Sequence, residues 1–302
     1  MRLWQKAMVL GAMVAAAAGA WPFGALSAGA GPIVGMAFSR GLSPDRYEIW
    51  TTQSGGRAPR RVTRSCGWDW YPSWSPDRKR LAFTRACSNG TLGIYVVNVN
   101  GSGLRRVTPT GLQAEWPTWS PDGKRLAFVA GSDGRSELYV VGDDGRGLRR
   151  LTHNHVSDDT PAWSPDGRAI LFSSRRAGGS HRLMLVSPAG VGARALPLRG
   201  GEPAWSRDGK RIAWAQSVKG AREETDKIWI ADSDGSHARQ LTHEHVGIAS
   251  HHPTWSPDGR TIAFMSNRAA GSESTSIWEI GADGTGLRQV SHARYEDADP
   301  DW

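Results

Sequence analysis

Residues 117–123 read Pro-Thr-Trp-Ser-Pro-Asp-Gly, and closely related blocks recur along most of the chain. Five copies of Pro-x-Trp-Ser-x-Asp are followed by a sixth Pro-x-Trp at residues 300–302. A repeat of roughly 40–50 residues is typical of propellers, in which each repeat forms one blade. Successive tryptophans of this motif are separated by 45, 44, 42, 50 and 47 residues: Trp74, Trp119, Trp163, Trp205, Trp255 and Trp302.

Each repeat continues in the same order after the tryptophan. Pro and Gly in Ser-Pro-Asp-Gly suit a tight turn, because Pro sets φ and Gly tolerates a positive φ. In the repeat that begins at residue 117, strand patterns follow at 126–128 and 138–141, and a Gly-rich turn leads to a fourth strand ending at Thr152. Six repeats of four antiparallel strands predict an all-β, six-bladed β-propeller.

The two ends of the chain complement each other. Residues 33–63 supply only the second, third and fourth strands of a blade, and residues 299–302 resemble the missing first strand. We predict that both ends share one blade, which closes the ring and removes an exposed sheet edge.

Residues 1–30 have the pattern of a secretory signal peptide. Arg2 and Lys6 precede an apolar run over residues 7–20, and Ala28-Gly29-Ala30 offers a cleavage site after Ala30. We therefore expect an exported protein, periplasmic or extracellular, with a propeller domain over residues 31–302. An uncleaved anchor is the alternative, and no later segment is apolar enough to span a membrane.

Composition excludes several classes of protein. The chain of 302 residues has a formal net charge of +8. It contains only 2 Cys, and this count rules out a disulfide-dense scaffold and a Cys-cluster zinc site. Arginine pairs on the outermost strands are interpreted as protection of sheet edges, so we expect no nucleic-acid partner. Cys66 and Cys87 fall in loops of one face, and in an exported protein we expect them to form a disulfide, with two free thiols as the alternative.

Histidines gather on the face that carries the blade-to-blade loops. Two His-x-His pairs could each offer two imidazoles to one divalent metal ion, the one cofactor that the sequence suggests. The alternative is that Thr-His simply ends the fourth strand. The candidate metal ligands are His153, His155, His243, His245, His251 and His292.

The same face carries acidic residues and aromatic residues near the start of each Pro-x-Trp strand. Exposed aromatic side chains beside charged groups are typical of interaction hot spots. The candidate partner-binding residues are Trp68, Trp70, Tyr71, Glu115, Trp116, Asp158, Asp159, Glu202, His252, Asp297 and Asp299.

The six Pro-x-Trp-Ser-Pro-Asp-type repeats resemble the TolB-type propeller family, over residues 32–302. TolB itself has a separate domain before its propeller, and its propeller binds a peptidoglycan-associated lipoprotein. Here we expect the propeller to follow the signal peptide directly, without that domain. Oligogalacturonate lyases are built from similar repeats and bind a divalent metal through clustered histidines. Prolyl oligopeptidases carry such propellers beside a hydrolase domain, but this chain has no Gly-x-Ser-x-Gly motif.

Together these features favour a non-enzymatic binding module, which we expect to be monomeric and to recognise a protein or a cell-envelope component. The alternative is a metal-dependent carbohydrate-active enzyme that uses the histidines at the channel mouth.

Overall fold

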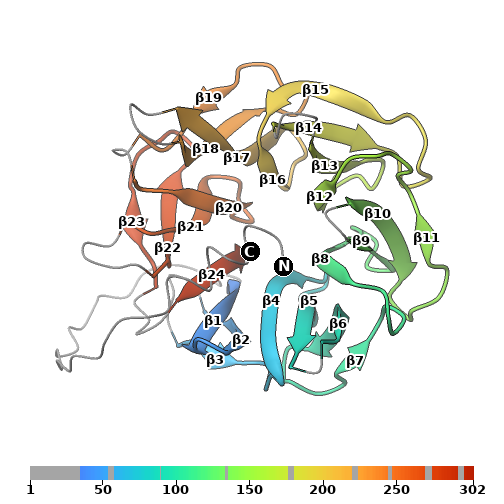
Figure 1. Ribbon diagram of the computed structural model, residues 1–302. Helices are drawn as coiled ribbons and strands as arrows, with labels where there is room; N and C mark the ends of the chain where they lie inside the picture. The colour runs from blue at the N-terminus through green and yellow to red at the C-terminus, as the bar shows by residue number, and fades with distance from the viewer. Residues whose placement is uncertain are drawn as a thin grey trace, which may run out of the picture.

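The computed structural model describes residues 35–53, 58–88, 90–132, 135–175, 180–219, 224–243, 247–268, 274–291 and 296–302. Within these ranges the chain forms 24 β-strands, and it contains no helix that is long and apolar enough to cross a membrane. The strands form four sheets of four and one sheet of eight, in which a parallel pairing at Tyr47 and Trp68 links two sets of four. The sets of four are arranged around a central axis (Figure 1), and we call them blades 1 to 6. The all-β propeller predicted from the repeats is confirmed.

The blades follow one another in chain order, each with its innermost strand named first. Blade 1 contains β24 (Asp297–Asp301), β1 (Ala37–Ser43), β2 (Arg46–Thr51) and β3 (Arg60–Arg61). Blade 2 contains β4 (Gly67–Trp74), β5 (Arg80–Cys87), β6 (Leu92–Asn98) and β7 (Arg105–Arg106). Blade 3 contains β8 (Ala114–Trp119), β9 (Arg125–Ser132), β10 (Arg135–Gly142) and β11 (Arg149–Arg150).

The second half repeats the arrangement. Blade 4 contains β12 (Asp158–Trp163), β13 (Ile170–Arg175), β14 (His181–Val186) and β15 (Arg194–Arg199). Blade 5 contains β16 (Gly201–Trp205), β17 (Arg211–Lys219), β18 (Glu224–Asp232) and β19 (Arg239–Gln240). Blade 6 contains β20 (Ser250–Trp255), β21 (Thr261–Ser266), β22 (Ser276–Gly281) and β23 (Arg288–Gln289).

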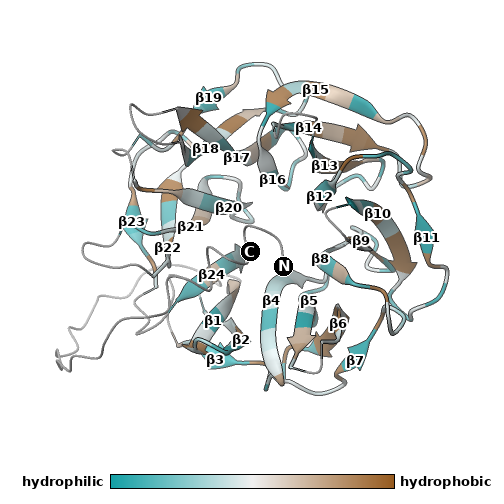
Figure 2. Cartoon of the chain, in the orientation of Figure 1, coloured by the Kyte–Doolittle hydropathy of each residue, from teal (hydrophilic) through white to brown (hydrophobic). Residues whose placement is uncertain are grey.

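Hydrophobic side chains lie between the blades. The third strands β10 and β14 carry long apolar stretches, whereas the outermost strands β11, β19 and β23 are hydrophilic (Figure 2). One core cluster joins Ile94 and Val96 of blade 2 to Trp119 and Phe128 of blade 3. The tryptophan of the repeat therefore packs against the preceding blade, which explains why it recurs once in each repeat.

The Ser-Pro-Asp-Gly segments form the turns between the first and second strands. In blade 3, Ser120 Oγ donates a hydrogen bond to Asp122 Oδ1 at 2.5 Å, and the same carboxylate accepts the Lys124 N–H at 3.1 Å. Gly123 has φ +67°, which the turn requires. Equivalent Ser–Asp bonds occur in all five copies, so this Asp has a structural role.

The two ends of the chain pair as predicted. Strand β24 is antiparallel to β1, with Ser39 opposite Ala298 and Arg40 opposite Asp297. The ring is therefore closed within blade 1 by strands from opposite ends of the chain. In blade 2, Cys66 and Cys87 form a disulfide with a Cα–Cα distance of 5.1 Å, also as predicted.

Candidate functional site

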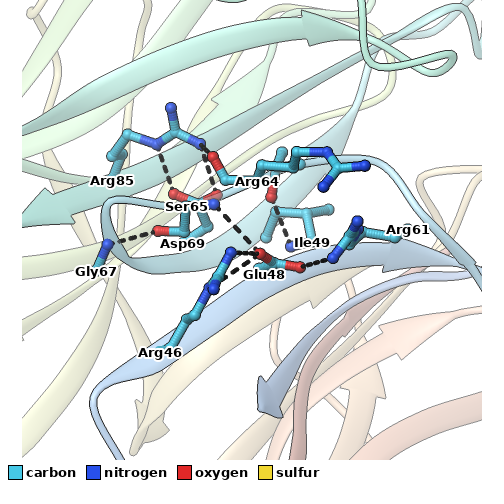
Figure 3. A network of polar contacts seen from close by, with 10 residues as sticks. Arg46, Glu48, Ile49, Arg61, Arg64, Ser65, Gly67, Asp69 and Arg85 are labelled. Atoms are coloured by element: carbon cyan, nitrogen blue, oxygen red, sulfur yellow. Dashed lines mark hydrogen bonds and ion pairs between the residues drawn. The ribbon is translucent and has the colours of Figure 1, made fainter. Parts of the chain in front are cut away.

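A buried ion pair sets the orientation of strand β4, which begins the aromatic segment. Arg85 donates two hydrogen bonds to Asp69, at 2.7 and 2.8 Å, and the Asp69 carboxylate is fully buried (Figure 3). Successive side chains of a strand point to opposite sides. Since Asp69 points inward to Arg85, its neighbours Trp68 and Trp70 both project from the other side of β4.

Blade 1 contacts the start of β4 through a second buried carboxylate. Glu48 is fully buried on β2 and accepts hydrogen bonds from Arg46 at 2.7 Å and from Arg61 at 3.4 Å. Its carboxylate also accepts the N–H of Ser65, just before β4 (Figure 3). Buried carboxylates with several donors hold one geometry, so the start of β4 is rigidly placed.

Four aromatic residues of the candidate set form one continuous run. Trp68 and Trp70 are stacked, with ring centroids 5.4 Å apart and planes 9° apart. Trp70 lies 6.4 Å from Tyr71, and Tyr71 lies 5.3 Å from Trp116 of blade 3. All four are partly exposed. We call Trp68, Trp70, Tyr71 and Trp116 the aromatic run.

A ring of six residues lies at the inner end of the aromatic run. Each precedes the Pro of a Pro-x-Trp motif, each has a positive φ, and a β-bulge interrupts the inner strand there. Bulges redirect a side chain away from the regular alternation. This channel collar consists of Tyr71, Trp116, Thr160, Glu202, His252 and Asp299.

Contacts between distant blades show that the collar side chains meet. Tyr71 of blade 2 lies 5.6 Å from the His252 ring of blade 6, and its N–H donates to Asp299 of blade 1 at 3.4 Å. His252 Nε2 is 3.6 Å from Glu202 Oε1 and 3.8 Å from Asp299 Oδ1. The collar therefore brings a phenol, an imidazole and two carboxylates together around the axis.

The charged groups of this cluster shift one another's pKa values. Burial opposes ionisation of Glu202, but the charges of His252 and His251 and hydrogen bonds from both residues outweigh it, lowering the Glu202 pKa to about 2. His251 has its two ring nitrogens 3.5 Å from Glu202 Oε2 and 3.6 Å from Asp226 Oδ2. Burial works against its charge, yet these carboxylates raise the His251 pKa overall.

Asp299 and Tyr71 differ from Glu202 because burial has the largest effect on their pKa and is not outweighed by nearby charges. Burial raises the pKa of Asp299, although His252 and the Ser39 hydroxyl partly offset it. Burial also raises the pKa of Tyr71, and the nearby Asp299 and Glu115 carboxylates add to this rise. The Tyr71 phenol therefore stays neutral and keeps a hydroxyl donor for the channel.

Three acidic residues of the candidate set are buried, and two of them, Asp158 and Asp297, lie away from the collar. Asp158 is fully buried and accepts hydrogen bonds from Asn154 at 2.7 Å and Ser174 at 2.6 Å. Asp297 is fully buried in a two-point ion pair with Arg40. Both were expected to bind a partner, but their carboxylates are buried against internal donors, so a direct role in binding stays a prediction. Asp159 accepts a hydrogen bond from Ser136 at 2.8 Å.

The candidate metal ligands that the structure describes are not gathered in one place. His153, His155 and His243 are exposed, and His251 instead lies between two carboxylates. His245 and His292 lie outside the described residues. Where the chain is described, no three His, Cys, Asp or Glu side chains form a group that could hold a metal ion.

Several residues at the site were not expected from the sequence. Thr160 completes the collar, and its hydroxyl accepts the Glu202 N–H at 3.2 Å. Tyr47 packs 6.2 Å from Trp70 and donates to Glu296 at 2.5 Å. The position before each repeated Pro was the one signal that could have identified Thr160, because it aligns with Tyr71 and Trp116 in the other repeats.

The fold and this site define a closed six-bladed β-propeller whose channel mouth is lined by aromatic and acidic groups. The chain belongs to the TolB β-propeller domain family, whose model matches residues 110–302.

Solved structures support the same architecture. TolB from Acinetobacter baumannii aligns with a TM-score of 0.73 at 23% identity, covering 89% of this chain and 66% of that one. An oligogalacturonate lyase in complex with manganese aligns with a TM-score of 0.55 at 17% identity, over 87% of this chain and 74% of that one. At such identities the likeness concerns the fold alone.

One curated relative is more similar in sequence over a shorter stretch. The uncharacterized peptidase YuxL of Bacillus subtilis is 29% identical over 103 residues. This match covers 33% of the present chain and 15% of that relative, so the chain corresponds to a small part of it.

Proposed function

We propose that this protein is an exported, non-enzymatic binding module that recognises a protein or another component of the cell envelope. The observation that carries the proposal is the aromatic run, which continues from the partly exposed Trp68 into the channel collar. Stacked, rigid aromatic side chains provide a large contact area at low entropic cost, and neighbouring carboxylates add directional polar contacts.

Membership in the TolB β-propeller family supports this role. The signal-peptide pattern of residues 1–30 supports export. The alternative of a metal-dependent enzyme receives no support from the described histidines, and we do not propose it.

The proposal is tested by quantitative affinity capture. Wild-type protein and a Trp68→Ala, Trp70→Ala variant are immobilised, and an envelope fraction of the source cells is cross-linked to each. We expect specific partners to be reduced at least about tenfold on the variant, since truncating an aromatic hot spot costs roughly 2 kcal/mol or more. Leu148→Ala is the control, because Leu148 is an exposed apolar residue before the outermost strand β11.

Both variants must retain the wild-type unfolding temperature to within a few degrees. Equal recovery of every cross-linked partner on wild type and on the Trp68, Trp70 variant would contradict the assigned surface.

A further inference from the structure

A second concave site lies between blades 5 and 6. It is a cavity of about 720 Å³, a size typical of small-molecule pockets. Its walls come from β17 and β19 of blade 5 and from the β20–β21 and β22–β23 turns of blade 6. These turns lie on the face opposite the blade-to-blade loops, so this blade 5–6 groove is separate from the aromatic run.

Four arginines line the blade 5–6 groove: Arg211, Arg239, Arg260 and Arg288. The lining also includes two carboxylates, both engaged locally. Glu279 pairs with Arg288. Asp283 accepts hydrogen bonds from the N–H and hydroxyl of Thr285, at 2.9 and 2.8 Å. Two positive charges of the groove are therefore uncompensated by its own lining.

A related position between blades 2 and 3 shows an equivalent arginine with a carboxylate partner. Arg80 lies over the Trp119 ring, 4.7 Å from its centroid, and its Nη1 is 2.6 Å from Asp143 Oδ2. Arg211 lies in the same way over Trp255, at 4.6 Å. No carboxylate of the described residues lies within 4 Å of the Arg211 guanidinium.

Arg211 lacks such a carboxylate because one residue differs in the turn between the third and fourth strands of blade 6. Asp143 donates its N–H to the Lys124 carbonyl, and Ala282 donates its N–H to the Arg260 carbonyl, so the two residues occupy the same position in their blades. In blade 6 this position has a methyl group where blade 3 has a carboxylate. The groove is thereby left open and positively charged.

The guanidinium groups keep free donor capacity. Arg211 donates to the Gly259 carbonyl at 2.7 Å, and Arg239 donates to the Ala282 carbonyl. Each guanidinium has five N–H groups, and these bonds hold the side chains in place without using all of them. Arg260 is exposed at the rim. Fixed guanidinium groups around a cavity suit two-point recognition of phosphate oxygens.

We propose that the blade 5–6 groove binds a phosphate monoester. A phosphate monoester carries a charge of roughly −1.5 to −2 near neutral pH, which matches the two uncompensated positive charges. The cavity is large enough to hold an organic group beside the phosphate. The phosphate could belong to a free metabolite or to a lipid headgroup, and the experiment distinguishes these sources.

The test uses two probes and three single variants of the full protein. Glucose 6-phosphate is titrated by calorimetry at low ionic strength, with glucose as the uncharged control. Phosphatidylcholine vesicles with and without phosphatidic acid are used for co-sedimentation. Arg260→Gln removes a charge at the rim, and Ala282→Asp introduces the carboxylate that faces Arg80 in the other groove. Arg168→Gln is the matched control, because Arg168 follows the same turn in blade 4.

We expect saturable binding of at least one phosphate probe, weakened at least about tenfold by Arg260→Gln and by Ala282→Asp and unchanged by Arg168→Gln. Binding of the sugar phosphate alone identifies a free ligand, and binding of the vesicles alone identifies a headgroup; either supports the site. The proposal is overturned if neither probe binds, or if all three variants bind as wild type does. Unfolding temperatures of the variants show whether each is folded.

Discussion

Arg40 and Asp297 join the two ends of the chain through a two-point ion pair, with Nε–Oδ1 and Nη2–Oδ2 distances of 2.7 and 2.9 Å. The Asp297 carboxylate is fully buried, and the Arg40 side chain is 18% exposed. The pair lies where β24 meets β1, so the closure of the ring depends on a buried charge as well as on strand pairing.

Removing the closure should destabilise the propeller. We expect Asp297→Ala to cost about 3 kcal/mol, because it leaves the Arg40 charge without its partner in a largely buried position. Deletion of residues 297–302 should cost more, since it also removes the inner strand of blade 1. Thermal unfolding measures both effects. Arg146→Ala is the control, because its ion pair with Asp144 is exposed and should contribute little. An unchanged unfolding temperature in the deletion variant would contradict ring closure by β24.

The disulfide should stabilise the part of blade 2 that presents the aromatic run. Cys66 precedes β4 and Cys87 ends β5, and 21 positions separate them in sequence. We expect the Cys66→Ser, Cys87→Ser variant to lose about 2–4 kcal/mol, measured by chemical denaturation. A reducing agent should lower the stability of wild type and leave the double variant unaffected. Two alkylatable thiols in the untreated, unfolded wild type would show that the bond is absent.

The Glu202 cluster should contribute a pH-dependent stabilisation. The Glu202 pKa falls from 4.5 to about 2, so its contribution is complete above about pH 4.5 and is lost as pH falls toward 2. The His251 pKa is raised above 6.5, so its contribution is complete below about pH 6.5 and is lost as pH rises through the raised value.

The difference in unfolding free energy between wild type and Glu202→Gln should therefore be largest between about pH 4.5 and 6.5. Denaturation curves for both proteins, measured from acid to alkaline pH, give this difference directly. A difference that stays constant with pH would show that Glu202 does not interact with charged histidine.

The repeated turn aspartates should support the fold and leave binding unchanged. We expect Asp122→Ala to cost about 1 kcal/mol, because the Ser120 hydroxyl and the Lys124 N–H lose their shared acceptor. Asp122→Asn keeps an oxygen acceptor and should cost less. Chemical denaturation measures both values. If Asp122→Ala weakened partner capture as strongly as the Trp68, Trp70 variant does, a purely structural role would be wrong.

Part of the candidate site could be predicted because blade order assigns loops to faces. Trp68, Trp70, Tyr71 and Trp116 lie at or next to blade-to-blade loops and were therefore predicted on one face of the propeller, and the structure brings their rings into contact. Whether each acidic side chain is held inside its blade or reaches the channel could not be predicted in this way. Asp297 and Asp299 are two residues apart, yet one is held by Arg40 inside blade 1 and the other reaches the collar.

The bulge in each inner strand is the physical reason for this difference. The residue before a proline ordinarily favours an extended conformation, so the sequence predicts regular alternation through Tyr71 or His252. Packing of six inner strands around one axis instead stabilises a positive φ at that position, which turns these side chains toward the channel. Local sequence contains no signal for that choice.

The sequence by itself determined the number of blades, the turns and the sharing of one blade by both ends. These features repeat, and each rests on local chemistry such as the fixed φ of Pro, the freedom of Gly and the alternation of strands. Only the tertiary structure decided which charges meet, because Glu202 and His252 come together across blades, and Arg211 and Ala282 line one groove from neighbouring blades. Such encounters depend on the curvature of the closed ring, which brings residues from separate repeats within a few ångströms of one another.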